Sequence, residues 1–221
     1  MAIILTIKEQ AHEIIMKKIL TQEYPLGARI NIGQLSKELG ISNSPIREAL
    51  TLLEKQGLVV STPNSGISVA DLTKRDRYEL AQTLLFLVAG AYEYCVKYSD
   101  INALCDDIES VLALQRRYLE EMNEYEFTYY ANRFTRCIVA ATGNRRLLNQ
   151  FDDVFPLFFL GSLYGYSGSY QNWLVSFGQN KDILQKIRSG RHDEVVAALT
   201  EHYYRPDWDL RGRSVDESGA G

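Results

Sequence analysis

The stretch GISNSPIREAL contains the side chains whose types and spacing point most clearly to chemistry. Ser42, Asn43 and Ser44 are residue types that cap the exposed amides of a helix start, and Pro45 is tolerated best in a first helical turn because it has no N–H to donate. A helix start offers free N–H groups and partial positive charge to anions, and Arg47 can add a bidentate contact to phosphate or guanine. The stretch therefore predicts a helix that begins with groups suited to binding nucleic acid.

The elements around this stretch follow a defined order. Thr6 and Glu9 form a capping-box pattern before a first helix, residues 32–39 form a short second helix, and the quoted stretch begins a third helix that stops at Gly57. The buried stripe of the third helix is predicted to comprise Ile46, Ala49, Leu50 and Leu53.

A hairpin is predicted next. Residues 58–62 are a short β-like run, residues 63–66 have turn chemistry, and residues 67–69 alternate apolar and polar side chains. Helix, helix, tight turn, helix and hairpin is the order of a winged helix-turn-helix domain. A Ser/Asn/Ser cap alone would indicate only capping, so the DNA-binding interpretation depends on this conjunction of elements.

The charge of the chain is unevenly distributed. The net charge is −4, but residues 1–70 contain seven Lys or Arg and six Asp or Glu, so their net charge is +1. All the acidity therefore belongs to residues 71–221, and a surface that binds phosphates is expected near the N-terminus.

The remainder of the chain predicts an all-helical domain of about six helices, and the whole is mainly α. Breaks are expected at residues 99–100, 123, 143–144, 161–169 and 189–190. We divide the sequence into a winged helix-turn-helix domain at 1–70, a linker at 71–73, a helical domain at 74–208 and a disordered tail at 209–221.

Enzyme chemistry has no sequence support. There is no Gly-rich phosphate loop after a strand, no nucleophile elbow and no HExxH, and the chain has only three histidines. The three cysteines form no CxxC pair and are expected in the core. The apolar run at residues 2–5 is too short for a signal peptide or a membrane span, so a cytoplasmic protein is expected.

Several separate blocks resemble the DNA-binding domain of GntR-type bacterial repressors. These blocks are PLGAR at 25–29, LSKELGIS at 35–42, PIREAL at 45–50, LEKQGL at 53–58 and GISV at 66–69. The later helices are similar to the FadR-like (FCD) branch, with Phe134 and AATGN at 140–144 near that branch's usual segment. The resemblance implies a homodimer that binds a palindromic operator in double-stranded DNA under control of a small-molecule metabolite.

Carried over residue by residue, the resemblance implies two groups of DNA-binding residues. Ser42, Asn43, Ser44, Pro45 and Arg47 fall at the start of the recognition helix, and Ser65 and Gly66 fall at the tip of the wing. Asn43 and Gly33 depart from the family, since many members have arginine at the first position and a basic residue at the second. Because asparagine suits adenine better than guanine, the operator is expected to differ from the family's guanine-centred half-site.

The resemblance also implies a metal site, with one Asp and three His, that this sequence does not keep. Its four positions correspond to Ala131, Thr135, Asn180 and His202, so no metal and no cofactor is expected. The candidates for an effector site are Tyr129, Asn132, Arg133, Arg136, Asn180 and His202. The aromatic side chains between residues 120 and 170 are consistent with an acyl or carboxylate effector. The alternative is a dimeric DNA-binding protein whose helical domain binds no ligand and serves dimerisation alone.

Overall fold

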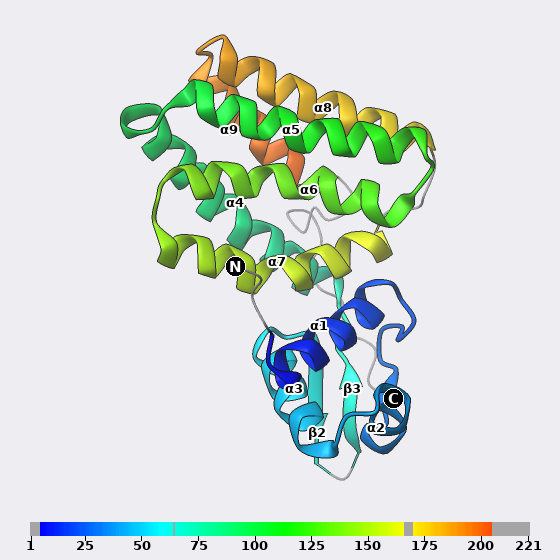
Figure 1. Cartoon of the computed structure of the whole chain (residues 1–221). Coiled ribbons are helices and arrows are strands. Elements are labelled where there is room, and N and C mark those ends of the chain that lie inside the picture. Colours follow the sequence, from blue (N-terminus) through cyan, green and yellow to red (C-terminus); the bar gives the residue numbers. More distant parts are fainter. Residues whose placement is uncertain (1–4, 64, 166–169, 205–221) are drawn as a thin grey trace, which may run out of the picture. The chain divides into compact units, whose positions relative to one another are not determined.

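The computed structural model describes residues 5–63, 65–165 and 170–204 (Figure 1). Its contacts divide the chain into two compact units. The winged unit comprises Met1–Leu72 with Asp152–Tyr166, and the helical unit comprises Thr73–Phe151 with Ser167–Gly221. In the described part of the chain, no helix is both long and apolar enough to cross a membrane. The predicted tail, residues 209–221, lies outside the described residues.

The winged unit begins with the three predicted helices, α1 (Ile7–Leu20), α2 (Ile32–Leu39) and α3 (Asn43–Lys55). The capping box of α1 is present, because the Thr6 side chain accepts a hydrogen bond from the Glu9 amide and the Glu9 carboxylate accepts one from the Thr6 amide. Gly40 ends α2 at φ 65°. The four predicted stripe residues of α3 are each at most 1% exposed, which confirms the periodicity.

Three short strands complete this unit. They are β1 (Arg29–Ile30), β2 (Val59–Thr62) and β3 (Gly66–Val69), in the antiparallel order β1-β3-β2. The hairpin of β2 and β3 is the predicted one. Strand β1 was not predicted, because two residues are too few to show an alternating pattern. It pairs Arg29 with Ser68 and Ile30 with Ile67.

Lys18 links α1 to α2 and to the loop after α1. Its Nζ forms an ion pair with Glu38 Oε1 at 2.6 Å and another with Glu23, while its own side chain is only 13% exposed. The hydrogen bonds that the Lys18 ammonium donates to Glu23 and Glu38 raise the pKa of Lys18 above its ordinary value. The stability that this rise contributes is complete below pH 10.5 and is lost only as the pH rises through the folded-state pKa. It is therefore constant across neutral pH.

We expect Lys18→Met to destabilise the winged unit by about 1 kcal/mol, a small value because both glutamates are largely exposed. Urea unfolding at pH 7 would measure the loss. Lys17→Met is the matched control, since Lys17 is an exposed neighbour on the same helix. Equal stability of the two variants would show that the ion pairs of Lys18 do not stabilise the winged unit.

The helical unit contains α4 (Lys74–Tyr98), α5 (Ile101–Glu120), α6 (Glu124–Ala141), α8 (Tyr170–Arg188) and α9 (His192–Tyr203), together with the start of α7 (Arg145–Gly165). Thr73, Asp100 and Asn123 cap α4, α5 and α6 with their side chains. Asn144 accepts hydrogen bonds from the first amides of α7. The predicted breaks at 99–100, 123, 143–144 and 189–190 are therefore confirmed.

The break predicted at residues 161–169 is partly wrong. Helix α7 continues through Gly161 to Gly165, and residues 166–169 lie outside the described residues. Leu160 and Ser162 are fully buried here, and the Ser162 hydroxyl donates to the Phe158 carbonyl one turn earlier. Burial of this face of α7 outweighs the low helix propensity of its glycines.

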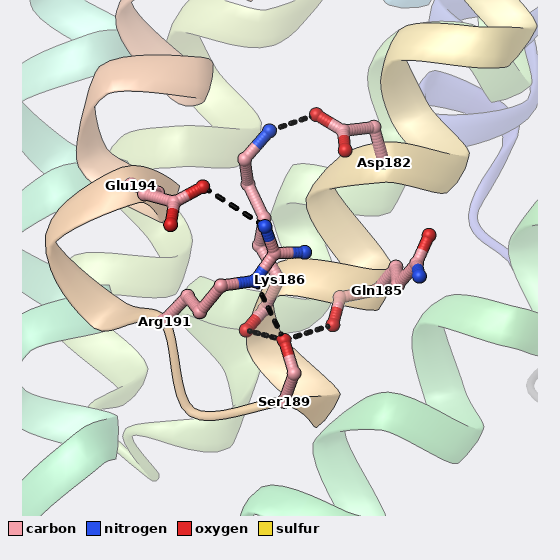
Figure 2. A network of polar contacts seen from close by, with 6 residues as sticks. All are labelled: Asp182, Gln185, Lys186, Ser189, Arg191 and Glu194. Carbon is pink, nitrogen blue, oxygen red and sulfur yellow. Dashed lines mark hydrogen bonds and ion pairs between the residues drawn. The ribbon is translucent and has the colours of Figure 1, made fainter.

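A polar network fixes the corner between α8 and α9 (Figure 2). The Ser189 hydroxyl donates to the carbonyl of Gln185 at 2.8 Å, and Arg191 Nε donates to Ser189 Oγ at 2.9 Å. Arg191 also pairs with Glu194 at 3.0 Å on the next helix. Because these contacts lie at the end of α8, they set the path by which α9 returns along the bundle.

Candidate nucleic-acid interface and effector site

The start of α3 is exposed and has no side-chain cap. Ser42 has extended backbone angles at the N-cap position, but its side chain makes no capping hydrogen bond, whereas the N-caps of α1 and α2 do. Ser42, Asn43 and Ser44 are all exposed. The sequence suggested these residues as caps, and the structure leaves their amides open to solvent. An uncapped helix start retains its capacity to bind an anion.

Arg47 lies one turn further along α3 and is exposed. Its neighbour Ile46 is fully buried, and Pro45 is half-buried. Within the described residues, the Arg47 guanidinium takes part in no ion pair. An exposed cation without an internal carboxylate partner is free to bind an external anion or a base edge.

The tip of the wing is exposed and is tied to the first strand. Ser65 and Gly66 are exposed, and Gly66 has φ 84°, a conformation that favours glycine. Arg29 Nε donates to the Ser65 carbonyl at 2.7 Å. Arg29 was not among the predicted interface residues. Its only sequence signal is a basic residue at the end of PLGAR, since its position beside the wing depends on the unpredicted pairing of β1 with β3.

Inside the helical unit, two sets of hydrogen bonds from buried side chains join four helices, and both sets meet α6. Asn180 Nδ2, on α8, donates to Gln115 Oε1 on α5 at 3.1 Å and to the Ala131 carbonyl on α6 at 2.8 Å. Thr135 Oγ1 donates to the Asn132 carbonyl, and the Tyr203 hydroxyl on α9 donates to Thr135 Oγ1, each at 2.9 Å. We call Gln115, Asn132, Thr135, Asn180 and Tyr203 the polar cluster.

The predicted effector residues divide into two groups. Asn132 and Asn180 belong to the polar cluster and are buried, and the His202 ring lies edge-on to Phe134 at 5.1 Å. Tyr129, Arg133 and Arg136 are half-buried, and the Arg133 guanidinium lies over the Tyr129 ring at 5.6 Å.

Two cavities of the helical unit lie away from the predicted effector residues. A groove of about 580 Å³ runs between α5 and α8, and a pocket of about 340 Å³ lies between α4 and the residues around the start of α7. Neither cavity is lined by a predicted effector residue.

The prediction missed Gln115 and Tyr203. Both lie on the buried stripes of their helices, and glutamine or tyrosine at such a position gives no signal of its own without the partner that it meets. Burial raises the pKa of the Tyr203 phenol above its ordinary value, so the group remains a neutral hydrogen-bond donor. Every member of the polar cluster is therefore uncharged at ordinary pH.

The donor set at the four metal positions does not fit a divalent cation. Ala131 has no ligating side chain, the Thr135 hydroxyl is engaged by Asn132 and Tyr203, and the Asn180 amide nitrogen is a donor. His202 is the one strong ligand of the four, whereas a first-row metal takes at least three. No group of three His, Cys, Asp or Glu side chains with metal-binding geometry occurs among the described residues.

Two family models match the chain. Residues 7–69 match the family described as "Bacterial regulatory proteins, gntR family", and residues 92–205 match the FCD domain. The chain belongs to the GntR family. Its FCD domain places it in the FadR-like subfamily, and the family consists of transcription regulators, not enzymes.

Transcription regulators of other bacteria align with most of this chain. An uncharacterised HTH-type transcriptional regulator, YdhC of Bacillus subtilis (strain 168), is 26% identical over 88% of this chain and 86% of its own length. The gluconate operon transcriptional repressor of the same organism is 25% identical over 87% and 80%. A putative GntR regulator from Rhodococcus sp. RHA1 shares the fold, with TM-score 0.77 and 16% identity over 89% and 93%.

This GntR protein is therefore a DNA-binding transcription regulator with a winged helix-turn-helix domain. The charge pattern along the sequence is consistent with the family assignment, because residues 1–70, which contain the helix-turn-helix, have a net charge of +1 while the chain as a whole has −4.

Proposed function

We propose that this protein is a homodimeric repressor, acting in the cytoplasm, whose winged domains bind a palindromic operator and whose helical domain binds a small-molecule effector. The observation that carries the proposal is the open start of α3, where three exposed polar residues without a cap stand one turn before an arginine without an ion pair. The name of the related gluconate operon repressor supports repression as the direction of control.

In this proposal α3 enters the major groove. The amides and side chains of Ser42, Asn43 and Ser44 contact the backbone or base edges, Pro45 fixes the first helical turn, and Arg47 contacts phosphate or guanine. Ser65 and Gly66 follow the adjacent DNA backbone from the wing. The proposed domains are residues 1–70 and 74–208, joined by the linker 71–73.

The test of DNA binding is fluorescence anisotropy with the chain's own upstream region, titrated at several salt concentrations. We expect a sequence-specific complex whose affinity exceeds that for an unrelated duplex by about 1000-fold or more. Equal affinity for both duplexes at every salt concentration would contradict the proposed function.

Asn43→Arg is expected to change which operator is preferred. Asparagine pairs best with adenine and arginine with guanine, so an adenine-to-guanine change at the contacted position should improve binding of the variant by roughly 10-fold and weaken wild-type binding. Selection of binding sites from a randomised duplex would identify the base. Asn102→Arg adds the same charge on an exposed part of α5 and controls for non-specific attraction. Identical base preference in wild type and Asn43→Arg would remove Asn43 from the interface.

The proposed dimer surface lies on α4, where large apolar side chains are exposed. Phe86 is 66% exposed, Tyr94 is 47% exposed and Tyr98 is 72% exposed. Gly90, between the first two, is exposed, and a Cβ added there would meet no other atom within 4 Å. A glycine inside a helix lowers the stability of the helix by about 1 kcal/mol relative to alanine. Its advantage at position 90 would be that, without a Cβ, it lets the backbone of another helix approach closely.

The spacing of these residues suits a second copy of the same chain. Phe86 and Tyr94 are each four residues from Gly90, so in an antiparallel crossing at Gly90 each Phe86 meets the partner's Tyr94. The pocket of about 340 Å³ beside Gly90 is lined by Leu87, Ala91 and Leu147 among others, and it can receive an aromatic ring. The α4 surface thus contains both protruding aromatic rings and a pocket that can receive one. A two-fold interface requires this, because the same surface faces itself.

The effector site is proposed within the helical domain, at or beside the polar cluster. Its candidate residues are Tyr129, Asn132, Arg133, Arg136, Asn180 and His202, and its ligand would be an acyl, carboxylate or other small metabolite. A ligand would act by favouring one packing of the helices and so changing the separation of the two winged domains. If a broad thermal-shift screen gave no stabilising compound, the alternative that the helical domain serves only dimerisation would be supported.

A further inference from the structure

We infer that the polar cluster and Trp173 of α8 together bind an uncharged, hydroxyl-bearing ligand, through Gln115, Asn180 and Trp173, in place of the metal-bound carboxylate that the family's metal site implies. The inference rests on the proposed effector function and specifies its ligand. It starts from hydrogen-bonding groups that the described residues leave unmatched inside the bundle.

The first unmatched pair is an amide nitrogen and an amide oxygen. Gln115 Nε2 and Asn180 Oδ1 are buried and have no hydrogen-bond partner among the described residues. Rotating the amides does not remove the mismatch. The Ala131 carbonyl can only accept, so Asn180 must present Nδ2 to it, and Gln115 must then present Oε1 to the same Nδ2. A donor on Gln115 and an acceptor on Asn180 are therefore left over.

The third unmatched group lies on the same face of α8. Trp173 Nε1 is buried without a partner, and the Trp173 ring stacks on Phe127 at 5.2 Å. Trp173, the buried Ser176 and Asn180 are spaced i, i+3 and i+7, so they form one inward stripe over two helical turns. Polar groups thus follow the inner face of α8 at successive turns, where an apolar stripe would be the ordinary arrangement.

The chemistry of these groups selects the ligand. A hydroxyl both donates and accepts, so one hydroxyl can satisfy Asn180 Oδ1 and Gln115 Nε2, and a second can accept from Trp173 Nε1. No member of the polar cluster is charged, and burying a carboxylate beside it without a cation would be unfavourable. A linear polyol carries several hydroxyls on one chain, so a single molecule offers partners for the Gln115–Asn180 pair and for Trp173.

The test uses a matched pair of probes on the full chain. Sorbitol and D-gluconate have the same carbon skeleton and differ at one end, where gluconate has a carboxylate. We expect sorbitol, or another polyol of a set containing glycerol and xylitol, to raise the thermal midpoint by about 3–5 °C at ten times its Kd. Gluconate and Zn²⁺, alone or together, should give no shift.

Gln115→Met keeps the length of the side chain but removes both the unmatched donor and the Oε1 atom that accepts from Asn180 Nδ2, and it should abolish the polyol shift. Gln185→Met, at an exposed glutamine on α8, is the matched control and should retain it. As a second readout, the side-chain amide NMR signals of Gln115 and Asn180 should move on titration with the polyol. This readout does not depend on how stable the variant is.

Three results would overturn the inference. Equal polyol shifts in wild type and Gln115→Met would identify general osmolyte stabilisation. A larger shift with gluconate or Zn²⁺ would show a carboxylate or metal site, and no shift with any polyol would show a closed structural cluster. Operator binding by ligand-free wild-type protein separates these results from failure of the proposed function, because a chain that binds its operator but no polyol keeps the function and loses only this inference.

Discussion

Arg47→Ala is expected to lower operator affinity by at least about 30-fold. Each arginine contact to phosphate or guanine contributes roughly 1–3 kcal/mol, and the proposed dimer would lose two of them. The fold should be unchanged, because Arg47 is exposed and takes part in no ion pair within the described residues, so the unfolding free energy should stay within about 0.5 kcal/mol of wild type. Anisotropy titrations and urea unfolding measure the two quantities separately.

The salt dependence of binding gives Arg47 a second signature. If each Arg47 contacts a phosphate, the slope of log K against log salt should fall by about two for the dimer. If it contacts a base, the slope changes less and the loss is concentrated on the correct operator. Arg116→Ala, at an exposed arginine of α5, is the matched control and should bind as wild type does. Wild-type affinity of Arg47→Ala would show that α3 does not face DNA as assigned.

The second large effect is expected at the α4 surface, where Phe86→Glu combined with Tyr94→Glu should convert the proposed dimer to a monomer. Charges placed against apolar side chains are strongly unfavourable, so the dimer Kd should rise by more than about 100-fold. Operator affinity should fall by a similar factor, because two unlinked winged domains no longer benefit from a high local concentration. Sedimentation velocity and anisotropy measure these effects. Val175→Glu, at a 53% exposed residue of α8, is the control.

A cysteine at the proposed two-fold axis tests the same surface by geometry. Gly90→Cys should form a disulfide between two copies under mild oxidation, since a glycine crossing brings the two backbones within disulfide range. The native thiols should contribute little. Cys95 and Cys105 are buried, and burial raises the pKa of Cys137 to about 11, so Cys137 is almost entirely protonated at pH 8. An unlinked Gly90→Cys protein that still sediments as a dimer would place the interface elsewhere.

A ligand bound at the polar cluster would control DNA binding through the packing of the helices in the helical unit. An effector that favours one packing of α5, α6, α8 and α9 changes operator affinity only if it binds the two packings with different affinity. In this protein the cluster connects all four helices through side chains, so a ligand that satisfies Gln115 and Asn180 acts directly on the contacts that hold the bundle together.

The sequence by itself determined the parts of the protein whose causes are local. The capping box at Thr6, the left-handed Gly40, the caps at Asp100 and Asn123 and the buried stripe of α3 all depend on residues within a few positions of one another. The order of these elements was enough to predict a winged helix-turn-helix followed by a helical bundle. The residues proposed to face DNA belong to the same class, because they stand at a helix start and a turn.

The tertiary structure alone decided the features that depend on distant partners. The two-residue strand β1 exists because Arg29 and Ile30 pair with β3, and α7 passes through Gly161 because its face is buried. Gln115 became a candidate ligand-binding residue only because it contacts Asn180, which is 65 positions away in the sequence. No local pattern marks such a residue, because hydrogen bonds that remain unmatched inside a core are created by the packing of helices and not by the sequence of any one helix.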